Sequence, residues 1–119
     1  MILLGSTGSI GVNTLNIARK FNLNVEVLVA GRNIQLLNQQ IKEFNPKIVV
    51  IDRVEDIHLV CHNNVLFGQE AILQAIEQST SNTVVNALVG FLGLKPTLKA
   101  IECGKKIALA NKESLVVAG

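Results

Sequence analysis

Short apolar runs alternate along the chain with longer stretches in which apolar residues recur every three or four positions. The short runs have the length of buried β-strands, and the longer stretches have the period of amphipathic helices. Strands and helices that alternate in this way are typical of βαβ units, which build a mostly parallel sheet. The expected strands cover residues 1–4, 25–30, 47–51, 65–67, 83–88 and 106–110.

The stretches between these strands predict helices, and several of them have recognisable ends. Asn33 is a residue type that caps helix N-termini, Pro46 stops the helix that follows Asn33, and Gly104 can end another helix. The expected helices cover residues 10–21, 33–44, 53–61, 69–78, 96–102 and the start of one at 114–118. The chain is therefore predicted to be an α/β, Rossmann-like domain with helices on both faces of a mostly parallel sheet.

Composition is consistent with one such domain and excludes several other classes. Hydrophobic residues make up 49% of the 119 residues and charged residues 17%, which is enough apolar surface for a core. The net charge of +2 is too small for a nucleic-acid surface. The apolar N-terminal run is too short for a signal peptide or membrane span, and Cys61 and Cys103 lack CxxC spacing. We expect a cytoplasmic protein with no nucleic-acid or membrane partner.

The first strand runs into a glycine-rich loop, GSTGSIG at residues 5–11, which opens the first helix. A dinucleotide loop needs glycine at a sharp turn, beside a pyrophosphate and where the helix meets the strand, and Gly5, Gly8 and Gly11 match these positions. The helix N-terminus then binds phosphate oxygens. No Lys-Ser/Thr pair ends the loop, so a P-loop nucleotide triphosphatase is disfavoured. The alternative is a glycine turn that only joins a strand to a helix.

The end of the second strand, Ala-Gly-Arg-Asn at residues 30–33, decides between NAD and NADP. NAD-dependent enzymes place a carboxylate here against the ribose hydroxyl. Arg32 instead offers a guanidinium, which can bind a 2′-phosphate through charge-assisted hydrogen bonds. NADP is therefore predicted over NAD, and the alternative for Arg32 is an ordinary solvated side chain.

Two further loops follow predicted strands at the edge of the sheet where open α/β folds bind ligands. Residues 87–90 form the first loop, and Asn111, Lys112, Glu113 and Ser114 begin the second. Helix capping would explain Glu113 and Ser114, but it gives no reason for the ammonium of Lys112. A functional role for this loop is therefore favoured over a structural one.

The remaining polar groups suggest no metal site. His58, Cys61 and His62 are close in sequence, but they lack a fourth ligand, so a surface or local packing role is expected. Cys103, near the end of a helix, is expected to be a small buried hydrophobe.

Three motifs together make the chain resemble the N-terminal region of the 1-deoxy-D-xylulose 5-phosphate reductoisomerase family. They are GSTGSIG at 5–11, AGRN at 30–33 and the segment 86–119, which contains LANKESLV. The resemblance is weakest over residues 52–82. It implies an NADPH-binding domain at 1–119 that stops before the catalytic domain and binds the cofactor without turnover.

The resemblance also implies the activity of the full-length protein. That activity converts 1-deoxy-D-xylulose 5-phosphate to 2-C-methyl-D-erythritol 4-phosphate, for isoprenoid precursors, by a rearrangement followed by hydride transfer from NADPH. It implies a Mg or Mn ion whose ligands lie outside this chain, and a homodimer. Lys112 is expected to reach the sugar phosphate, and no catalytic residue or metal ligand is assigned here. The expected cofactor contacts are Gly5, Thr7, Gly8, Ser9, Ile10, Gly11, Gly31, Arg32, Asn33, Ala87, Leu88, Val89, Asn111 and Glu113.

Two other functions stay open at this point. The glycine loop alone would also suit another NADP-dependent oxidoreductase, such as a semialdehyde or homoserine dehydrogenase, although LANKESLV argues against it. A non-catalytic NADP-sensing module is the second, and Lys112 at a substrate position argues against that.

Overall fold

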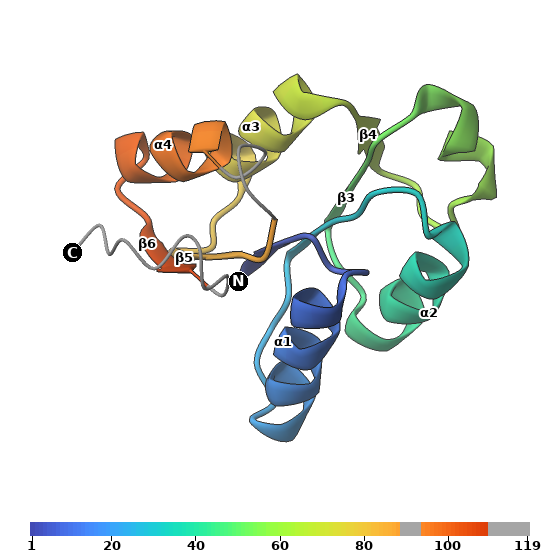
Figure 1. Cartoon of the computed structure of the whole chain (residues 1–119), viewed down its shortest axis with the longest axis horizontal. Helices are drawn as coiled ribbons and strands as arrows, with labels where there is room; N and C mark the ends of the chain where they lie inside the picture. Colours follow the sequence, from blue (N-terminus) through green and yellow to red (C-terminus); the bar gives the residue numbers. More distant parts are fainter. Residues whose placement is uncertain (89–93, 110–119) are drawn as a thin grey trace.

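The computed structural model describes residues 1–88 and 94–109, and within them six strands form one sheet (Figure 1). The strand order is β4-β3-β2-β1-β5-β6, and all neighbours are parallel. Since the order reverses between β1 and β5, the carboxyl ends of these two strands flank the switch point where open α/β sheets bind ligands. The strands are β1 (Ile2–Leu4), β2 (Val27–Val29), β3 (Ile48–Ile51), β4 (Val65–Phe67), β5 (Thr83–Asn86) and β6 (Lys106–Leu109).

Helices cover both faces of this sheet, which confirms the predicted α/β, Rossmann-like class. Helices α1 and α2 lie on one face, and α3 and α4 lie on the other (Figure 1). The short segment between β3 and β4, predicted as a helix at 53–61, is a 3₁₀ helix. The helices are α1 (Ser9–Lys20), α2 (Ile34–Phe44), η1 (Val54–Leu59), α3 (Gln69–Gln78) and α4 (Leu94–Glu102).

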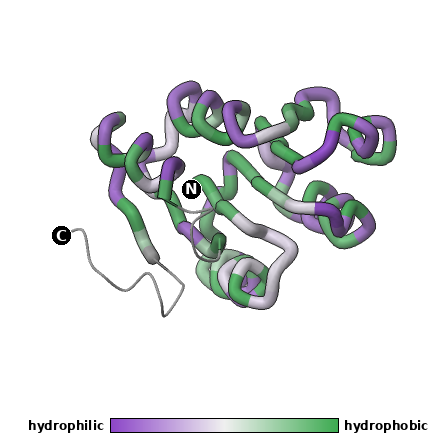
Figure 2. Tube along the Cα trace, turned by 45° about the horizontal axis from the view of Figure 1, so that its top comes forward, coloured by the Kyte–Doolittle hydropathy of each residue, from purple (hydrophilic) through white to green (hydrophobic). Residues whose placement is uncertain are grey.

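The core forms two apolar layers, one on each side of the sheet. Leu3 packs in the layer that contains residues of α1 and α2, whereas Ile2 and Leu4 pack against α3 and α4. Figure 2 shows the hydrophobic strands inside and hydrophilic positions along the helices. Because both faces are covered, the strands are apolar at nearly every position, as parallel strands usually are.

The helix ends follow the local sequence closely. The side chain of Asn33 accepts a hydrogen bond from the Leu36 N–H at 3.2 Å, which confirms the predicted cap of α2. Helix α2 stops before Pro46, and Asn45 takes the left-handed conformation with φ of 48°. After α4, Gly104 has φ of +71°, and the N–H groups of Gly104 and Lys105 donate to the carbonyls of Ile101 and Ala100 in the last turn, as in a glycine C-cap.

One expectation about burial was wrong, one helix is less covered than its apolar period suggests, and one expected helix lies outside the described residues. Cys103 is exposed, because it follows the last residue of α4 where the chain turns away at Gly104. Ile17 and Phe21 follow the apolar period of the helix expected at residues 10–21, but they are 55% and 64% exposed, so the covered face of this helix is narrower than the period suggests. The helix expected at 114–118 lies outside the described residues. Among the helices that are described, none has the length and apolarity to cross a membrane.

Candidate functional site

The glycine loop lies at the switch point, fixed between the ends of β2 and β5. The N–H groups of Gly5 and Ser6 both donate to the carbonyl of Val29, at 2.8 and 2.9 Å. Gly5 has φ of +85°, and a Cβ on it would lie 3.1 Å from the carbonyl carbon and oxygen of Ala87. Only glycine combines this conformation with this close approach.

Gly11 lets α1 begin directly against the loop. A Cβ at this position would lie 1.9 Å from the Gly5 carbonyl oxygen and 2.8 Å from backbone carbons of Gly5 and Ser6. A side chain cannot fit against backbone at these distances. The predicted packing role of Gly11 is therefore visible in the structure.

The N-terminus of α1 is left open for an anion. Its first helical hydrogen bond runs from the Val12 N–H to the Gly8 carbonyl at 2.9 Å, so the N–H groups of Ser9, Ile10 and Gly11 have no acceptor within the helix. The helix has no side-chain cap at Gly8 and no acidic residue in its first turn. These N–H groups therefore keep the partial positive charge that binds phosphate oxygens.

Among the described residues, none fills the space next to Gly8. The nearest atom to a Cβ on Gly8 would be the Gly5 carbonyl oxygen, at 3.9 Å, and the φ of −75° suits any residue. The fold therefore does not require glycine here. A ligand that approaches the backbone closely does provide a reason for it.

Arg32 lies beyond the end of β2 and contacts a residue that sequence reasoning missed. Its Nε donates to Asp52 Oδ2 at 3.1 Å, and both side chains are largely exposed. Asp52 directly follows β3, the neighbour of β2, so its position at the carboxyl edge was the available signal. The two Nη groups of Arg32 meet no acceptor within the described part of the chain, and they can bind a phosphate.

Two adjoining hollows extend along the carboxyl edge. Arg32 and Asp52 line one of about 290 Å³, together with residues that include Gly31, Gly68 and Leu88.

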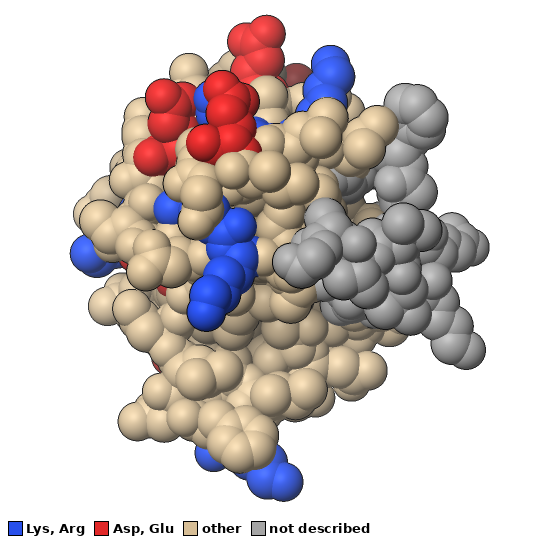
Figure 3. All heavy atoms as spheres, turned by 90° about the vertical axis from the view of Figure 1, so that its left-hand side faces the viewer, with Lys and Arg blue, Asp and Glu red and all other residues tan. Residues whose placement is uncertain are grey.

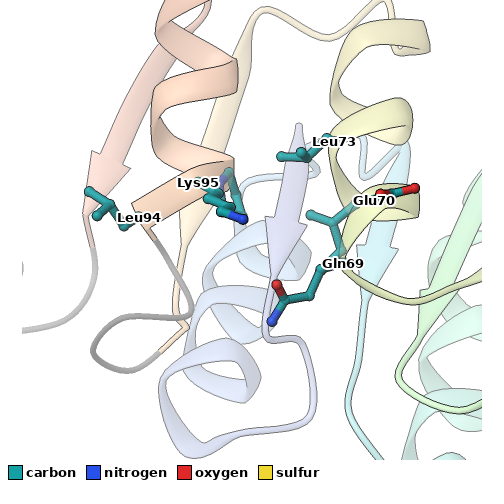
Figure 4. A pocket seen from close by; sticks show the side chains of 7 residues that line it. Gln69, Glu70, Leu73, Leu94 and Lys95 are labelled. Carbon is teal, nitrogen blue, oxygen red and sulfur yellow. The ribbon is translucent and has the colours of Figure 1, made fainter.

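A second hollow, of about 470 Å³, lies between the first turns of α3 and α4 (Figure 4). In this view Leu73 and Lys95 extend toward each other, while the Glu70 carboxylate points away. Gln69 and Ile72 line both hollows, so the two can receive different parts of one extended ligand.

The end of β5 carries another residue that the sequence did not single out. Asn86 is buried, its Nδ2 donates to Thr97 Oγ1 at 2.8 Å, and its Oδ1 accepts from the Leu88 N–H at 3.0 Å. These bonds hold the loop after β5 beside the glycine loop and tie it to α4. A polar residue at the end of a buried strand was the signal that could have found it.

The structure brings part of the predicted site together along one edge. The loop of residues 5–11 and the residues Gly31, Arg32, Ala87 and Leu88 all follow the carboxyl ends of β1, β2 and β5. Asn33 lies there too, but its side-chain oxygen is used to cap α2. Val89, Asn111, Lys112 and Glu113 lie outside the described residues.

Neither the histidines nor Cys61 lines the two hollows at this edge. His62 Nε2 lies 2.7 Å from the Pro46 carbonyl oxygen, and Nδ1 accepts from the Asn64 N–H at 2.9 Å, so His62 has the expected local packing role. His58 and Cys61 are exposed. Over residues 1–88 and 94–109, no three His, Cys, Asp or Glu side chains are grouped to hold a metal ion.

Charges on the face shown in Figure 3 are mixed. Lys and Arg side chains are dispersed among neutral residues, and acidic side chains gather at one end. One local pair joins Lys99 Nζ to Glu77 Oε2 at 3.4 Å. The hydrogen bond and the negative charge of Glu77 raise the pKa of Lys99. Such pairs at the surface contribute little to stability.

Relatives of known name match the whole chain. It is 61% identical to a 1-deoxy-D-xylulose 5-phosphate reductoisomerase of Nautilia profundicola over 119 residues, which are 100% of this chain and 32% of the relative. It is 57% identical over 122 residues to the protein of the same name from Wolinella succinogenes, again over 100% of this chain and 34% of the relative. The chain thus spans about a third of the length of these relatives.

Solved structures with the same fold are also named as reductoisomerases. The reductoisomerase from Zymomonas mobilis in complex with NADPH is 36% identical, with a TM-score of 0.83 over 98% of this chain and 33% of that chain. A DOX-P reductoisomerase in complex with NADPH, fosmidomycin and magnesium is 33% identical, with a TM-score of 0.85 over 98% of this chain and 31% of that chain.

The family model for 1-deoxy-D-xylulose 5-phosphate reductoisomerase matches residues 1–119. This match, the sequence identities and the shared fold lead to one conclusion: the chain belongs to the 1-deoxy-D-xylulose 5-phosphate reductoisomerase family.

Proposed function

We propose that residues 1–119 are an NADPH-binding domain, and that the dinucleotide lies across the carboxyl edge of the sheet. The observation that carries this proposal is the uncapped N-terminus of α1, held by Gly11 against the glycine loop at the switch point. This arrangement places free N–H groups where a pyrophosphate can accept their hydrogen bonds. A relative from Zymomonas mobilis has been solved with NADPH, which supports the choice of cofactor.

Within this proposal, several of the predicted contacts have separate tasks. Thr7, Gly8, Ser9 and Ile10 bind the pyrophosphate, and Arg32, beside Gly31, binds the 2′-phosphate. Ala87, Leu88 and Val89 border the cofactor after β5. From the last loop, Asn111 and Glu113 contact the cofactor, and Lys112 contacts the phosphate of the substrate.

The longer protein would use this domain to reduce a sugar phosphate. We propose that it converts 1-deoxy-D-xylulose 5-phosphate to 2-C-methyl-D-erythritol 4-phosphate as a cytoplasmic homodimer, with NADPH supplying the hydride. The solved relatives include complexes with magnesium. As the family resemblance implies, we assign the ligands of such an ion to the part of the longer protein that lies outside residues 1–119. The 119-residue chain is therefore expected to bind NADPH without oxidising it when the substrate is added.

One of the two alternative functions is disfavoured by the family match, and the other needs an assay. A semialdehyde or homoserine dehydrogenase is disfavoured, because the reductoisomerase family model matches the chain from its first to its last residue. A sensor that only binds NADP would show no turnover even as the longer protein. An assay of the longer protein with NADPH, the sugar phosphate and magnesium separates a sensor from a reductoisomerase.

Replacing Arg32 by aspartate should weaken NADPH binding by at least about tenfold, because a charge-assisted pair is replaced by repulsion of the 2′-phosphate. NADH lacks that phosphate, so its affinity should change little. Fluorescence titration with both nucleotides measures the two effects. Arg53→Asp is the matched control, since Arg53 pairs with Asp56 and does not line the hollow beside Arg32. Equal losses for NADPH and NADH would remove Arg32 from this role.

A further inference from the structure

A buried amide on α2 bonds to the glycine loop on the side of the loop that faces α2. Gln40 is 5% exposed, and its Nε2 donates to the backbone carbonyl of Ser6 at 2.8 Å, across 34 residues of sequence. Ser6 is completely buried. Since a carbonyl only accepts hydrogen bonds, the NH₂ group of Gln40 must face it. This is a direct link between α2 and the loop that opens α1.

The link fixes the direction of one peptide group. In a trans peptide the C=O of one residue and the N–H of the next point in opposite directions, and no cis peptide occurs in the described residues. Because Gln40 holds the Ser6 carbonyl toward α2, the Thr7 N–H is directed away from α2. The Thr7 N–H has no acceptor among the residues the structure describes. It is therefore available to a ligand on the side of the loop that faces away from α2.

Core packing alone does not explain a glutamine at this position. Its neighbours on the buried side of α2 are Ile34, Leu37 and Ile41, so an apolar residue would fit the pattern. Gln40 Oε1 and Ser6 Oγ are buried without a hydrogen-bond partner in the described part of the chain. A buried polar atom left unpaired lowers stability. Stability alone therefore gives no reason for a glutamine at this position.

We propose that Gln40 is a positioning residue for nucleotide binding, which aims the Thr7 N–H at the pyrophosphate by holding the Ser6 carbonyl. The inference rests on the proposed function, because it concerns the same loop. It differs from the role of Arg32 in one measurable way. The pyrophosphate is common to NADPH and NADH, so Gln40 acts on both nucleotides equally, whereas Arg32 separates them.

The test replaces Gln40 by methionine, which has a similar length but no hydrogen-bond donor. Gln40→Met should weaken NADPH and NADH by the same factor, about three- to tenfold for one lost hydrogen bond. Its thermal unfolding midpoint should stay close to that of the parent chain, because the unpaired Gln40 Oε1 is removed while the Ser6 carbonyl loses a hydrogen-bond partner. Gln39→Met is the matched control, since Gln39 is the exposed neighbour on the same helix, and its affinities should not change.

Three results would overturn the inference. Parent-like affinity in Gln40→Met would show that the loop is positioned without the amide. A selective loss of NADPH would place Gln40 with the 2′-phosphate instead. A large drop in the unfolding midpoint, or loss of the fold, would show that the amide supports the core. If the parent chain binds neither nucleotide, the proposed function fails and this inference fails with it.

Discussion

Gly11→Ala is expected to lower the free energy of unfolding by at least about 3 kcal/mol or to prevent folding, because it forces overpacking against rigid atoms. The new Cβ would lie 1.9 Å from the Gly5 carbonyl oxygen, and the nearest carbons also belong to backbone. A flexible side chain could rotate away, but the loop backbone cannot, since Gly5 and Ser6 are bonded to Val29. Urea unfolding followed by circular dichroism measures the loss.

Gly8→Ala is the matched control on the same loop. Within residues 1–88 and 94–109, its Cβ would meet only the Gly5 carbonyl oxygen, at an ordinary 3.9 Å, and its φ of −75° suits alanine. Stability should therefore stay within about 0.5 kcal/mol of the parent chain, or rise slightly. Nucleotide affinity should fall, because the methyl group enters the space proposed for the pyrophosphate. A Gly11→Ala variant as stable as the parent would contradict the close contact between α1 and the loop.

Acid should destabilise the chain through one buried carboxylate, that of Glu26. Its side chain accepts hydrogen bonds from Ser79 Oγ at 2.9 Å, from the Thr80 N–H and Oγ1 at 3.0 Å, and from Ser81 Oγ at 3.1 Å. Burial disfavours the charged form, but these hydrogen bonds outweigh it and lower the pKa of Glu26 to about 2. The group thus joins the start of β2 to the turn before β5.

The sign of the pH effect follows from this lowered pKa. An unfolded Glu26 titrates near 4.5, so its stabilising contribution is complete above that pH and is lost as the pH falls toward 2. The shift corresponds to about 3 kcal/mol, at about 1.4 kcal/mol per pKa unit. Urea unfolding at several pH values between about 7 and 2 should show this loss in the parent chain.

Glu26→Gln isolates the contribution of this carboxylate from that of other acids. The variant should be less stable near neutral pH, and the difference from the parent should shrink as the pH falls. The exposed Glu55→Gln should show neither effect. Nucleotide affinity should be unchanged, because Glu26 lies before β2, at the edge of the sheet opposite the glycine loop. A constant difference between Glu26→Gln and the parent chain at all pH values would contradict the lowered pKa.

The fold could be predicted from the sequence because its signals are local. Apolar runs marked every strand of the sheet, since strands buried on both faces have apolar residues throughout. Asn33 and Gly104 marked helix ends through preferences of single residues. Gly5 and Gly11 were placed correctly because the strand, the loop and the helix they join are consecutive in the sequence.

The missed features depend on residues that are distant in the sequence. Gln40 contacts a loop 34 residues away, and Glu26 contacts a turn more than 50 residues away. Nothing in the sequence near either residue indicates its partner. Exposure on α1 was also missed, because a helical period shows which residues share a face but not how far that face is covered. Ile17 and Phe21 illustrate this limit.

Parallel titration of the purified chain with NADPH and NADH, followed by nicotinamide fluorescence, tests the proposed cofactor role most directly. Circular dichroism should first show that the sample is folded. We expect saturable binding of NADPH and weaker binding of NADH, because only NADPH offers a 2′-phosphate to Arg32. A folded chain that binds neither nucleotide, or binds both equally, would contradict the proposal that the carboxyl edge of this sheet is an NADPH site.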